Sequence, residues 1–532
     1  MTMAAATGAD GAHPFPPGRY NAAVDLIDRN LAAGRHAKTA FIDEAGRYSY
    51  ADLAERVDRF ANVLAALEIA PGQRVVLVLL DTIDFPTCFL GAIKAGVVPI
   101  PTNTLFQPAD FAHILADSQA RALVVSDALL GRLLEAAALA DWHGLVVVAG
   151  ADGGGRLMLT RLMDQADGHA SAAPTQPDDT CFWLYSSGST GQPKGTVHVQ
   201  TSLMETARLF GQGVLGITES DVVYSAAKLF FAYGLGNALT FPLSVGASAV
   251  LISGRPTPDV VNGVLRRAAP SLFCGVPTLF SSLLACPGLV EKGEHALRLC
   301  TSAGEALPIE VGRAWTARTG VDIVDGIGST EMLHIFVSNR PGSVRYGVTG
   351  KPVPGYRARL VDECRQEVAL GEVGEMEVNG PTAASHYWNN LEKTRATFVG
   401  EWVRTGDKFR QDADGDYIHC GRADDMLKVG GIWVSPMEVE SALLGHAAIQ
   451  EAAVIGLADG QGLVKPKAFV VLKPGIPAAT DLTQALKDHV KDRLAPYKYP
   501  RWIEFVEELP KTATGKIQRH VLRNREAGAA DK

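Results

Sequence analysis

The sequence predicts an α/β protein with a large N-terminal domain of layered α/β subdomains and a small α+β C-terminal domain. Three observations lead to this fold class. A chain of 532 residues exceeds what one hydrophobic core usually serves. Continuous apolar runs, typical of buried strands, alternate with segments of helical period. From about Asp425 the pattern restarts as a compact unit, which indicates a second domain.

The N-terminal region begins with a segment of unusual composition. Residues 1–17 are rich in Ala, Gly and Pro and contain no basic region followed by an apolar core. We therefore expect a loose tail there and not a signal peptide. Strands of the large domain are expected at residues 74–80, 122–126, 145–149 and 247–253, and helices at residues 50–67 and 259–268.

The same reading continues into the C-terminal part of the chain. The segment Ser435-Pro436-Met437-Glu438 has the spacing of a capping box with proline at the first helical position, which predicts a helix over residues 438–444. The other elements expected here are strands at residues 372–379, 452–456 and 468–472 and a helix at residues 483–494.

Composition and charge favour a soluble enzyme. Hydrophobic residues make up 47% of the chain and charged residues 20%, as in globular proteins with large cores. The net charge of −8 argues against a nucleic-acid partner, because a basic surface is missing. No apolar run reaches the roughly 18 residues of a membrane span, so no membrane partner is expected. The seven cysteines show no metal-binding spacing, and we expect them to be reduced and mostly buried in a cytoplasmic enzyme.

A polar loop at residues 185–195, Tyr-Ser-Ser-Gly-Ser-Thr-Gly-Gln-Pro-Lys-Gly, suits the binding of a polyphosphate. Its glycines let backbone N–H groups approach phosphate oxygens, its hydroxyls donate further hydrogen bonds, and Lys194 supplies positive charge. The pattern is not a Walker A loop, because Pro193 stands where that loop has glycine. Without Pro-Lys-Gly, such a stretch would usually be a solvated linker. The candidate nucleotide-binding residues of the loop are Ser186, Ser187, Gly188, Ser189, Thr190, Gly191 and Lys194.

A second glycine pattern, Gly-Gln-Gly-Val-Leu-Gly at residues 211–216, fits the dinucleotide fingerprint in spacing but not in context. It follows a helical stretch at residues 202–210 and leads toward a strand, whereas the fingerprint requires a strand followed by a helix. We therefore do not expect a Rossmann site.

The phosphate loop resembles the signature loop of the adenylate-forming superfamily, which comprises acyl-CoA synthetases, luciferases and peptide-synthetase adenylation domains. The resemblance extends in register from about Ala40 to Arg523. It implies that the loop holds the β and γ phosphates of ATP. It also implies an ATP- and acyl-binding domain at residues 18–423 and a mobile domain at residues 424–532.

The segment Gly326-Ile327-Gly328-Ser329-Thr330-Glu331 resembles a second superfamily motif. The resemblance implies that Thr330 meets the α phosphate and that Glu331 holds Mg²⁺. A hard divalent ion shared with substrate phosphates calls for such an oxygen ligand. Read alone, a glutamate after a Gly-Ser-Thr turn would more often be a helix-capping residue.

Two motifs further along resemble the ribose site and the hinge of the superfamily. Arg404-Thr405-Gly406-Asp407 matches the turn whose aspartate accepts both ribose hydroxyls, although alone it indicates only a turn. Gly421-Arg422-Ala423-Asp424-Asp425 matches the junction between the domains. The resemblance implies that Arg422 belongs to the ATP site and that Asp424 is the hinge.

The C-terminal domain carries two further candidate motifs. Lys511-Thr512-Ala513-Thr514-Gly515-Lys516 resembles the loop that ends in the adenylation lysine, which implies a catalytic role for Lys516. By resemblance, Gly430, Gly431 and Trp433 line the tunnel for the thiol of coenzyme A. Paired glycines suit a close approach of pantetheine, and an ordinary hairpin turn explains them equally well.

By resemblance to the superfamily, the acyl pocket of this chain is expected to be formed by the segments 228–234, 302–305 and 332–334. The aromatic segment has flat apolar walls and no acidic residue to pair with an amino group, which favours a compact aromatic acid. At least one of these aromatics could be core packing instead, and His334 could be a structural histidine. The stretches 226–237 and 325–334 closely resemble those of bacterial benzoate CoA ligases. The implied substrate-binding residues are Phe231, Ala232, Tyr233, Ala303, Gly326, Gly328, Leu333 and His334.

The implied adenine site departs from the superfamily at one position. Most members have an aromatic residue where Ile327 stands, so Ile327 can cover one face of the base without stacking. The segment 302–307 would bound the base on its other face. The remaining implied ATP-binding residues are Gly304, Glu305 and Asp325.

The resemblance implies an acid–thiol ligase that uses ATP, Mg²⁺ and coenzyme A to convert benzoate through benzoyl-AMP to benzoyl-CoA. Three relatives stay open: a ligase for a substituted or heteroaromatic acid, an aryl adenylate enzyme that loads a carrier protein, and a peptide-synthetase adenylation domain. A non-catalytic nucleotide-binding regulator is disfavoured by Lys516, Glu331 and Asp407. The resemblance also leaves open a homodimer.

Overall fold

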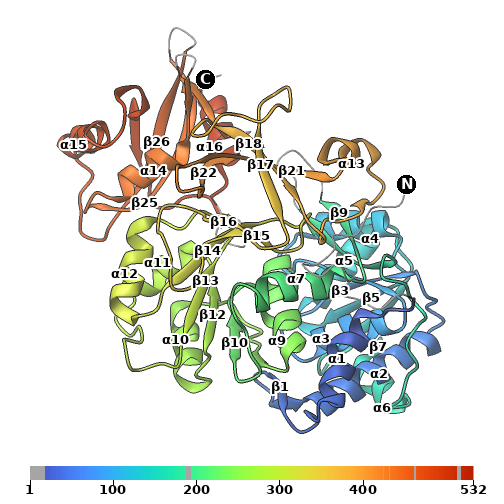
Figure 1. The fold of residues 1–532 in the computed structure, drawn as a ribbon. Coiled ribbons are helices and arrows are strands. Elements are labelled where there is room, and N and C mark those ends of the chain that lie inside the picture. Colours follow the sequence, from blue (N-terminus) through green and yellow to red (C-terminus); the bar gives the residue numbers. More distant parts are fainter. Residues whose placement is uncertain are drawn as a thin grey trace.

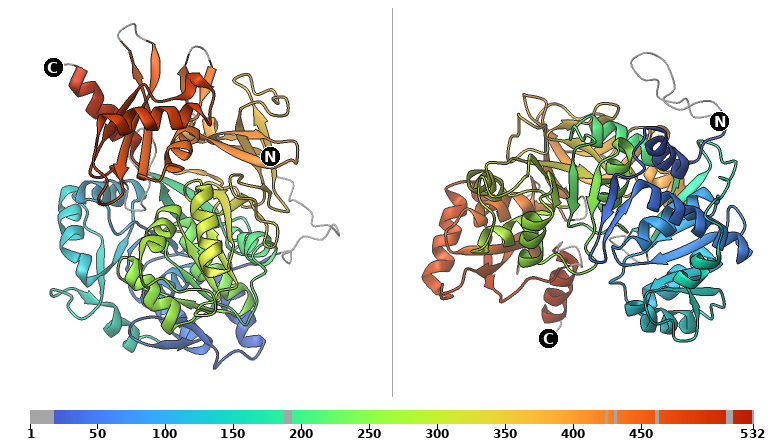
Figure 2. Two further views of the ribbon diagram at one scale, coloured as in Figure 1. Left: turned by 90° about the vertical axis from the view of Figure 1, so that its left-hand side faces the viewer. Right: turned by 90° about the horizontal axis from the view of Figure 1, so that it is seen from below.

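The structure is a computed structural model that describes residues 18–186, 193–422, 425–429, 432–459, 463–511 and 517–530 (Figure 1). The expected N-terminal tail, residues 1–17, lies outside these ranges. The described chain forms a large α/β part and a smaller α+β part, as the sequence predicts. Figures 1 and 2 show the C-terminal elements grouped at one end of the molecule, next to β14–β16.

One layer of the large part is a five-stranded parallel sheet in the order β4-β3-β5-β6-β7. Its central strands are buried on both faces because helices cover the sheet, which explains their uninterrupted Val and Leu runs. The strands are β3 (Arg74–Val78), β4 (Val98–Pro101), β5 (Ala122–Ser126), β6 (Leu145–Ala149) and β7 (Leu157–Met158). The helices of this layer are α1 (Ala22–Ala32), α2 (Tyr50–Ala66), α3 (Asp84–Lys94), α4 (Pro108–Ser118), α5 (Leu130–Leu139) and α6 (Leu159–Gln165), with a short 3-10 turn η1 (Asp127–Leu129).

A second layer is a nine-stranded sheet in the order β16-β15-β14-β13-β12-β10-β11-β1-β2. The six strands from β14 to β1 in this order are parallel, so their carboxyl ends meet at one edge. The strands are β1 (Thr39–Ile42), β2 (Arg47–Ser49), β10 (Val222–Ser225), β11 (Ser248–Val250), β12 (Leu272–Gly275), β13 (Leu299–Ser302), β14 (Ile323–Gly328), β15 (Ile335–Ser338) and β16 (Lys351–Pro352). The helices are α7 (Ser202–Thr206), α8 (Ala232–Leu235), α9 (Phe241–Val245), α10 (Pro258–Arg267), α11 (Pro277–Ala285) and α12 (Ile309–Thr319), with π-helical turns η2 (Ala207–Gln212) and η3 (Gly236–Thr240).

Two antiparallel sheets complete the large part. A three-stranded sheet, β19-β9-β8, brings a segment near residue 387 against the strand that begins at Lys194. Its strands are β8 (Thr180–Ser186), β9 (Lys194–Val199) and β19 (His386–Tyr387). A five-stranded sheet contains β17 (Arg357–Val361), β18 (Gly374–Asn379), β20 (Phe398–Val399), β21 (Trp402–Gln411) and β22 (Tyr417–Arg422), and α13 (Leu391–Thr397) precedes β20.

The C-terminal part has hydrophobic clusters of its own. Leu443, Val454, Val470 and Leu486 belong to one of them and are buried. The strands are β23 (Leu427–Val429), β24 (Ile432–Val434), β25 (Ile449–Ala458), β26 (Val464–Leu472) and β27 (Trp502–Phe505). The helices are α14 (Pro436–Leu444), α15 (Thr480–Lys491) and α16 (Arg519–Ala530), with a 3-10 turn η4 (Pro496–Lys498).

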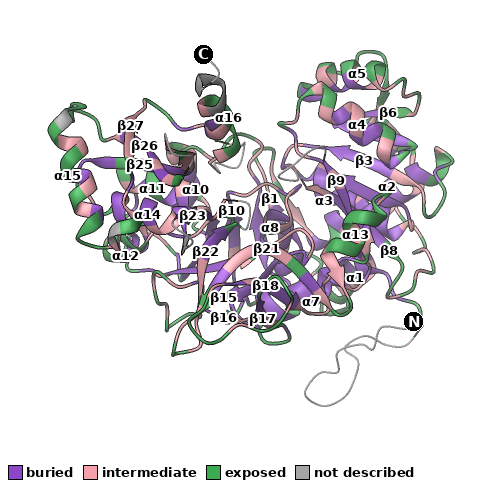
Figure 3. Cartoon of the chain, turned by 90° about the horizontal axis from the view of Figure 1, so that it is seen from above, coloured by how far each residue is buried: buried purple, intermediate pink, exposed green. Residues whose placement is uncertain are grey.

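Burial follows this layering. Figure 3 shows the strand β3 in purple, between helices of the right-hand part, and exposed green surface on helices such as α13. Five of the seven cysteines are buried, Cys286 is partly exposed and Cys364 is exposed, and all seven are free thiols. This confirms the prediction of reduced, mostly buried cysteines.

Within the described ranges, every helix is too short or too polar to cross a bilayer.

Three local predictions need correction. The predicted strand at residues 247–253 is only β11 (Ser248–Val250), because the apolar run continues past the end of the sheet. The capping box at the start of α14 is only half formed: Ser435 Oγ accepts the N–H of Glu438 at 3.3 Å, but the Glu438 carboxylate pairs with Lys498 Nζ at 2.6 Å. Thr405-Gly406-Asp407 lies inside strand β21 and is not a separate turn.

Candidate active site

The candidate site lies at the carboxyl edge of the nine-stranded sheet. The loop after β10 leads to Phe231 and Tyr233, the loop after β13 contains Ala303 to Glu305, and the end of β14 leads to His334. Parallel strands place these loops side by side, and ligands of open α/β sheets bind at this edge. The topology therefore brings together three segments that begin at Phe231, Ala303 and His334 in the sequence.

Aromatic side chains form the wall of the predicted acyl pocket. Phe230 is buried in the main core, whereas Phe231 remains partly exposed, with the two ring centroids 4.5 Å apart. Phe230 therefore serves core packing, as the sequence allowed for one of these residues. Ala232 and Tyr233, at the start of α8, are partly exposed like Phe231.

His334 is buried among three aromatic rings. It is 3% exposed, and its ring centroid lies 4.6 Å from Phe241, 5.2 Å from Phe210 and 5.5 Å from Tyr233. Burial lowers the pKa of His334 to about 3, so the imidazole is neutral at physiological pH. Nε2 lies 3.3 Å from the carbonyl oxygen of Tyr233 and donates to it, which leaves Nδ1 as an acceptor. Nδ1 has no hydrogen-bond partner among the described residues.

Backbone geometry holds this histidine in place. A Cβ atom on Gly236, in the π-helical turn η3, would lie 2.4 Å from Cδ2 of His334, so only glycine fits there. Leu333 has a φ of 64°, an uncommon conformation for a residue with a side chain, and it is 2% exposed. Single-turn π-helices and such strained residues are frequent at functional sites.

The predicted adenine site is formed by the ends of β13 and β14. Ala303 is buried, and Gly304 follows with a φ of 97°, a conformation that favours glycine. Burial raises the pKa of Asp325 to about 7, against hydrogen bonds from the backbone of Leu307 and the Ser302 side chain that lower it. Its Oδ1 atom has no geometrically acceptable partner within the described residues. Ile327 is partly exposed and pairs with Val337 across the β14–β15 hairpin.

The side of the site predicted to bind phosphate contains an ion pair joined by a tyrosine. Lys194 Nζ lies 3.4 Å from Glu331 Oε1, and the Tyr387 hydroxyl lies 2.7 Å from both atoms. Burial alone would raise the pKa of Glu331, but the Lys194 ammonium and the Tyr387 hydroxyl outweigh it and hold the pKa below its usual value. Glu331 is therefore an ionised carboxylate. No helix begins at it, so it is not a capping residue.

A buried histidine supports the neighbouring threonine. His198 Nε2 lies 2.8 Å from the carbonyl oxygen of Thr330, and the His198 ring stacks on Phe182 with centroids 5.2 Å apart. Burial lowers the pKa of His198 to about 4, so the ring is neutral and Nε2 donates. This contact fixes the backbone of Thr330 next to the carboxylate of Glu331.

The predicted ribose-binding aspartate lies on a strand pair. Asp407 of β21 is directly opposite Arg422 of β22, whose Nη1 lies 3.4 Å from Asp407 Oδ2. His419 Nε2 lies 3.3 Å from the other oxygen, Oδ1. A cation and an imidazole therefore flank the carboxylate, with one of its oxygens facing each.

One contact links the C-terminal part to the site. The backbone N–H of Ile517 donates to Glu305 Oε1 at 3.3 Å. The residue directly after Lys516 thus touches the segment predicted to bound the adenine. Ser187, Gly188, Ser189, Thr190, Gly191, Asp424, Gly430, Gly431, Lys516 and the side chain of Trp433 lie outside the described residues.

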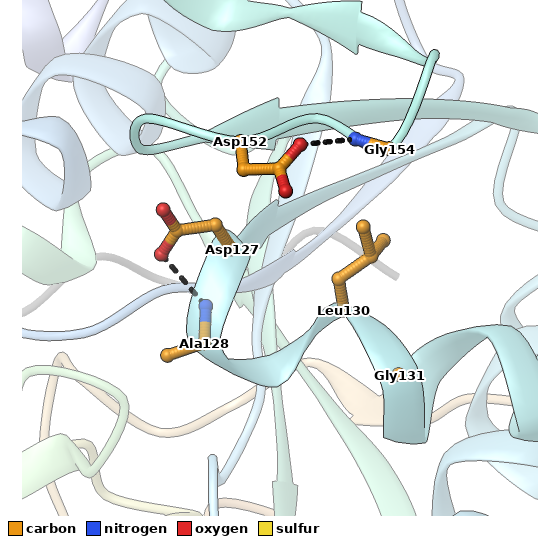
Figure 4. A pocket seen from close by; sticks show the side chains of 6 residues that line it. All are labelled: Asp127, Ala128, Leu130, Gly131, Asp152 and Gly154. Atoms are coloured by element: carbon orange, nitrogen blue, oxygen red, sulfur yellow. Dashed lines mark hydrogen bonds between the residues drawn. The ribbon is translucent and has the colours of Figure 1, made fainter.

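A separate hollow of about 410 Å³ opens on the five-stranded sheet, near the ends of β5 and β6 (Figure 4). Two aspartates line it, but backbone groups already use their carboxylates. Asp127 accepts the N–H groups of Ala128 and Ala151, and Asp152 accepts that of Gly154. None of its lining residues belongs to the predicted motifs, so we do not assign it to the site.

Comparisons with known proteins identify the family. The model of the AMP-binding enzyme matches residues 28–388, and that of the AMP-binding enzyme C-terminal domain matches residues 438–516. The chain belongs to the AMP-binding enzyme family. This AMP-binding enzyme is 59% identical to "Benzoate--CoA ligase" of Thauera aromatica over 96% of both chains. It is 48% identical to "4-hydroxybenzoate--CoA/benzoate--CoA ligase" of Rhodopseudomonas palustris, covering 96% of this chain and 95% of that one.

A solved structure agrees with these relatives. The crystal structure of a benzoate CoA ligase from Burkholderia xenovorans LB400 superposes with a TM-score of 0.89 at 52% identity, covering 95% of this chain and all of that one. The α/β fold with a separate C-terminal AMP-binding domain is thereby confirmed.

The residues of this AMP-binding enzyme fit a magnesium ion shared with a nucleotide. No group of three His, Cys, Asp or Glu residues in the described ranges is arranged to hold a metal by itself. Mg²⁺ bound with a nucleotide needs only one or two carboxylates, since phosphate oxygens and water complete its shell. Glu331 is ionised, and its two side-chain contacts both fall on Oε1, which leaves Oε2 for a cation.

Sequence reasoning missed Tyr387, His198 and His419, although all three contact candidate residues of this AMP-binding enzyme. Tyr387 lies 56 residues after Glu331 and 193 after Lys194. None of the three belongs to a motif with chemical spacing of its own. Only the folded chain brings them to the site.

Proposed function

We propose that this chain is a benzoate–CoA ligase, which activates benzoate with ATP to benzoyl-AMP and transfers the benzoyl group to coenzyme A. The observation that carries the proposal is the ring cluster of Tyr233 and the neutral His334, close in the chain to Glu331, which pairs with Lys194. A flat apolar pocket accepts a phenyl ring, and the polar side holds its carboxylate near ATP. The names of the relatives support the same substrate.

In the first half-reaction, a carboxylate oxygen of benzoate attacks the α phosphorus of ATP. The bond from that phosphorus to the bridging oxygen breaks, and pyrophosphate leaves. Thr330 and Lys516 stabilise the charge that develops on the α phosphate, and Lys194 holds the β and γ phosphates. Glu331 holds Mg²⁺, which when bound neutralises charge on the leaving pyrophosphate. Asp407, Arg422 and Asp325 hold the ribose and the base.

In the second half-reaction, the thiol of coenzyme A loses its proton and attacks the acyl carbon, and AMP leaves with the bonding electrons. We infer a rotation of the domain at residues 424–532 about Asp424 between the two steps. Gly430, Gly431 and Trp433 then line the path of the pantetheine arm. The strands β23 and β24 on either side of residues 430 and 431 pair as a hairpin, which is compatible with such a lining.

The division into domains at residues 18–423 and 424–532 is part of this proposal. It is supported by the separate hydrophobic clusters of the C-terminal elements. The contact between Ile517 and Glu305 supports an arrangement in which the segment that begins at Ile517 lies beside the nucleotide site, as adenylation requires.

A second candidate substrate is a ring-hydroxylated benzoate. The buried Nδ1 of His334 has no hydrogen-bond partner in the described part of the chain and can accept a hydrogen bond from a hydroxyl group. The Rhodopseudomonas palustris relative is named for both 4-hydroxybenzoate and benzoate.

The test is product formation by the purified protein with ATP, Mg²⁺ and coenzyme A. Benzoate, hydroxybenzoates, aminobenzoates, cinnamate and a short fatty acid are offered singly, and AMP and the acyl-CoA are followed together. Equal amounts of AMP and benzoyl-CoA, with benzoate preferred, are expected. Adenylate and pyrophosphate without a CoA thioester would indicate loading of a carrier protein. No pyrophosphate with any acid would contradict the assignment as a ligase.

A further inference from the structure

The strongest unassigned feature of the site is the Tyr387 hydroxyl between Lys194 and Glu331. The Lys194 ammonium donates to it and it donates to Glu331 Oε1, each at 2.7 Å. Tyr387 is 2% exposed, and the side chains of Lys194 and Glu331 are 18% and 16% exposed. Hydrogen bonds of this length to charged groups, shielded from water, are among the strong ones.

The hydroxyl keeps the two charges at a defined separation. Lys194 Nζ lies 3.4 Å from Glu331 Oε1, which is longer than the roughly 2.7–2.9 Å of a direct charge-assisted hydrogen bond. Nζ also lies 3.9 Å from the centre of the Tyr387 ring, within the range of a cation–π contact. Lys194 is thus bound to the tyrosine more closely than to the carboxylate.

The tyrosine itself is rigidly held. Its strand β19 pairs with β9, and its backbone N–H donates to Thr394 Oγ1 at 3.0 Å. Its ring packs on Phe398 with centroids 5.3 Å apart.

The segment before Tyr387 also forms hydrogen bonds with the turn that carries Glu331. The Ala384 N–H donates to the Glu331 carbonyl at 2.7 Å, and the Thr382 hydroxyl donates to the Met332 carbonyl at 2.7 Å. One short segment therefore anchors both the strand that begins at Lys194 and the turn that carries the carboxylate.

From this geometry we propose that Tyr387 is a positioning residue, which orients Glu331 toward a divalent cation and Lys194 toward the phosphates of the nucleotide. It does so by occupying Glu331 Oε1, so that Oε2 faces the cation. The inference rests on the proposed function, since it assigns Mg²⁺ and ATP to this side of the site. Tyr387 acts in the first half-reaction and not in the second.

The test uses Tyr387→Phe, which removes the hydroxyl and keeps the ring. The readout is calorimetric binding of α,β-methylene-ATP, a non-reacting analogue, with and without Mg²⁺. In the wild type we expect Mg²⁺ to strengthen binding. In the variant we expect this gain to shrink about tenfold, the effect of losing a hydrogen bond to a charged group. Thioester formation from supplied benzoyl-AMP and coenzyme A stays at the wild-type rate.

Tyr50→Phe is the matched control, because Tyr50 is buried and its hydroxyl donates to the Ala247 carbonyl at 2.7 Å, away from the motifs. It should leave the Mg²⁺-dependent gain unchanged. In a Glu331→Gln background, Tyr387→Phe should cause no further loss of that gain, since the two residues act through one contact. Should Tyr387→Phe fail to fold, Thr394→Val, which removes the acceptor of the Tyr387 N–H, is expected to reduce the gain in the same direction.

An unchanged Mg²⁺-dependent gain in Tyr387→Phe would overturn the proposal, as would equal losses in the two half-reactions. Analogue binding requires no acid. If the wild type made no benzoyl-CoA, the proposed function would fail while the role of Tyr387 remained testable.

Discussion

At the residue scale, the buried histidines make stability depend on pH. The pKa of His334 is lowered to about 3 by burial, while a histidine in an unfolded chain has a pKa of about 6.5. Below about pH 6.5 this histidine binds a proton in the unfolded chain but not in the folded protein. The free energy of unfolding therefore decreases as the pH falls. Above that pH the contribution of the neutral ring is fully present. His198, with a pKa of about 4, acts in the same direction.

We therefore expect the free energy of unfolding of His334→Gln to depend less on pH, because about one proton fewer is taken up on unfolding. The wild type should lose up to about 1.4 kcal/mol per pH unit through this group between about pH 6.5 and pH 5. Gln keeps a donor toward the Tyr233 carbonyl but does not titrate. Urea unfolding across this range measures the slope. His143→Gln is the control, because the His143 side chain is 85% exposed, and it should keep the wild-type slope.

A second residue-scale prediction concerns the proposed adenylation lysine. Lys516→Ala should slow pyrophosphate release by about 10²-fold or more, because a positive charge at the α phosphate is lost. Thioester formation from supplied benzoyl-AMP should persist, since the proposed rotation would withdraw Lys516 in that step. Lys511→Ala is the control: Lys511 lies in the same loop and pairs with Glu451 at 2.6 Å. Equal losses in both half-reactions of Lys516→Ala would contradict the division of roles.

Single residues differ in how far the sequence could locate them. Lys194, Glu331 and Asp407 stand in ordered motifs; Lys194 begins β9, Glu331 follows β14 and Asp407 lies on β21. Tyr387 and His419 could not be found this way, because their contacts join residues on different strands or segments of the folded chain. Among the described residues, Nδ1 of His334 has no hydrogen-bond partner, and this environment also results from the packing of three rings.

At the scale of elements, the π-helical turn η3 determines the space available beside His334. Gly236→Ala should raise KM for benzoate about tenfold or more, since its Cβ would lie 2.4 Å from the His334 ring. KM for ATP should stay unchanged. Steady-state kinetics with each substrate varied in turn measures both.

Gly131→Ala is the matched helical control for this prediction. A Cβ at Gly131, in α5, meets nothing within 4 Å. That variant should retain activity and gain up to about 1 kcal/mol of stability. An unchanged KM for benzoate in Gly236→Ala would show that His334 does not line the binding site of the acid.

Buried parallel strands were the most predictable elements. β5 and β6 have the predicted bounds, because strands covered on both faces read as continuous apolar runs. β21 was not predicted, since Thr405-Gly406-Asp407 reads locally as a turn while pairing with β18 and β22 keeps it in the sheet. The π-helical turns were also missed, because one extra residue per turn leaves no clear periodicity.

At the scale of the whole molecule, the restart of the pattern near Asp425 predicted two parts, but not how they face each other. That arrangement depends on contacts such as Ile517 with Glu305, which are 212 residues apart. No local pattern encodes such a contact.

The proposed rotation leads to a prediction at this scale. Asp424→Pro fixes φ at the pivot and should leave pyrophosphate release intact while thioester formation slows about tenfold or more. Asp424→Ala, which keeps a free φ, should retain more of the second step. Rapid-quench measurement of each half-reaction separates the two effects. Normal turnover to the thioester in Asp424→Pro would place the pivot elsewhere.

The distribution of thiols allows a direct test of the proposed motion. Cys364 is exposed in the large part, Cys286 is partly exposed, and residues 421–532 contain no cysteine. With Cys286 changed to serine, Cys364 becomes the single reactive position for a maleimide dye. A second cysteine in place of the exposed Ala485 on α15 would carry the partner dye. Energy transfer between the two would then follow each turnover as a change in distance, without disturbing any residue of the site.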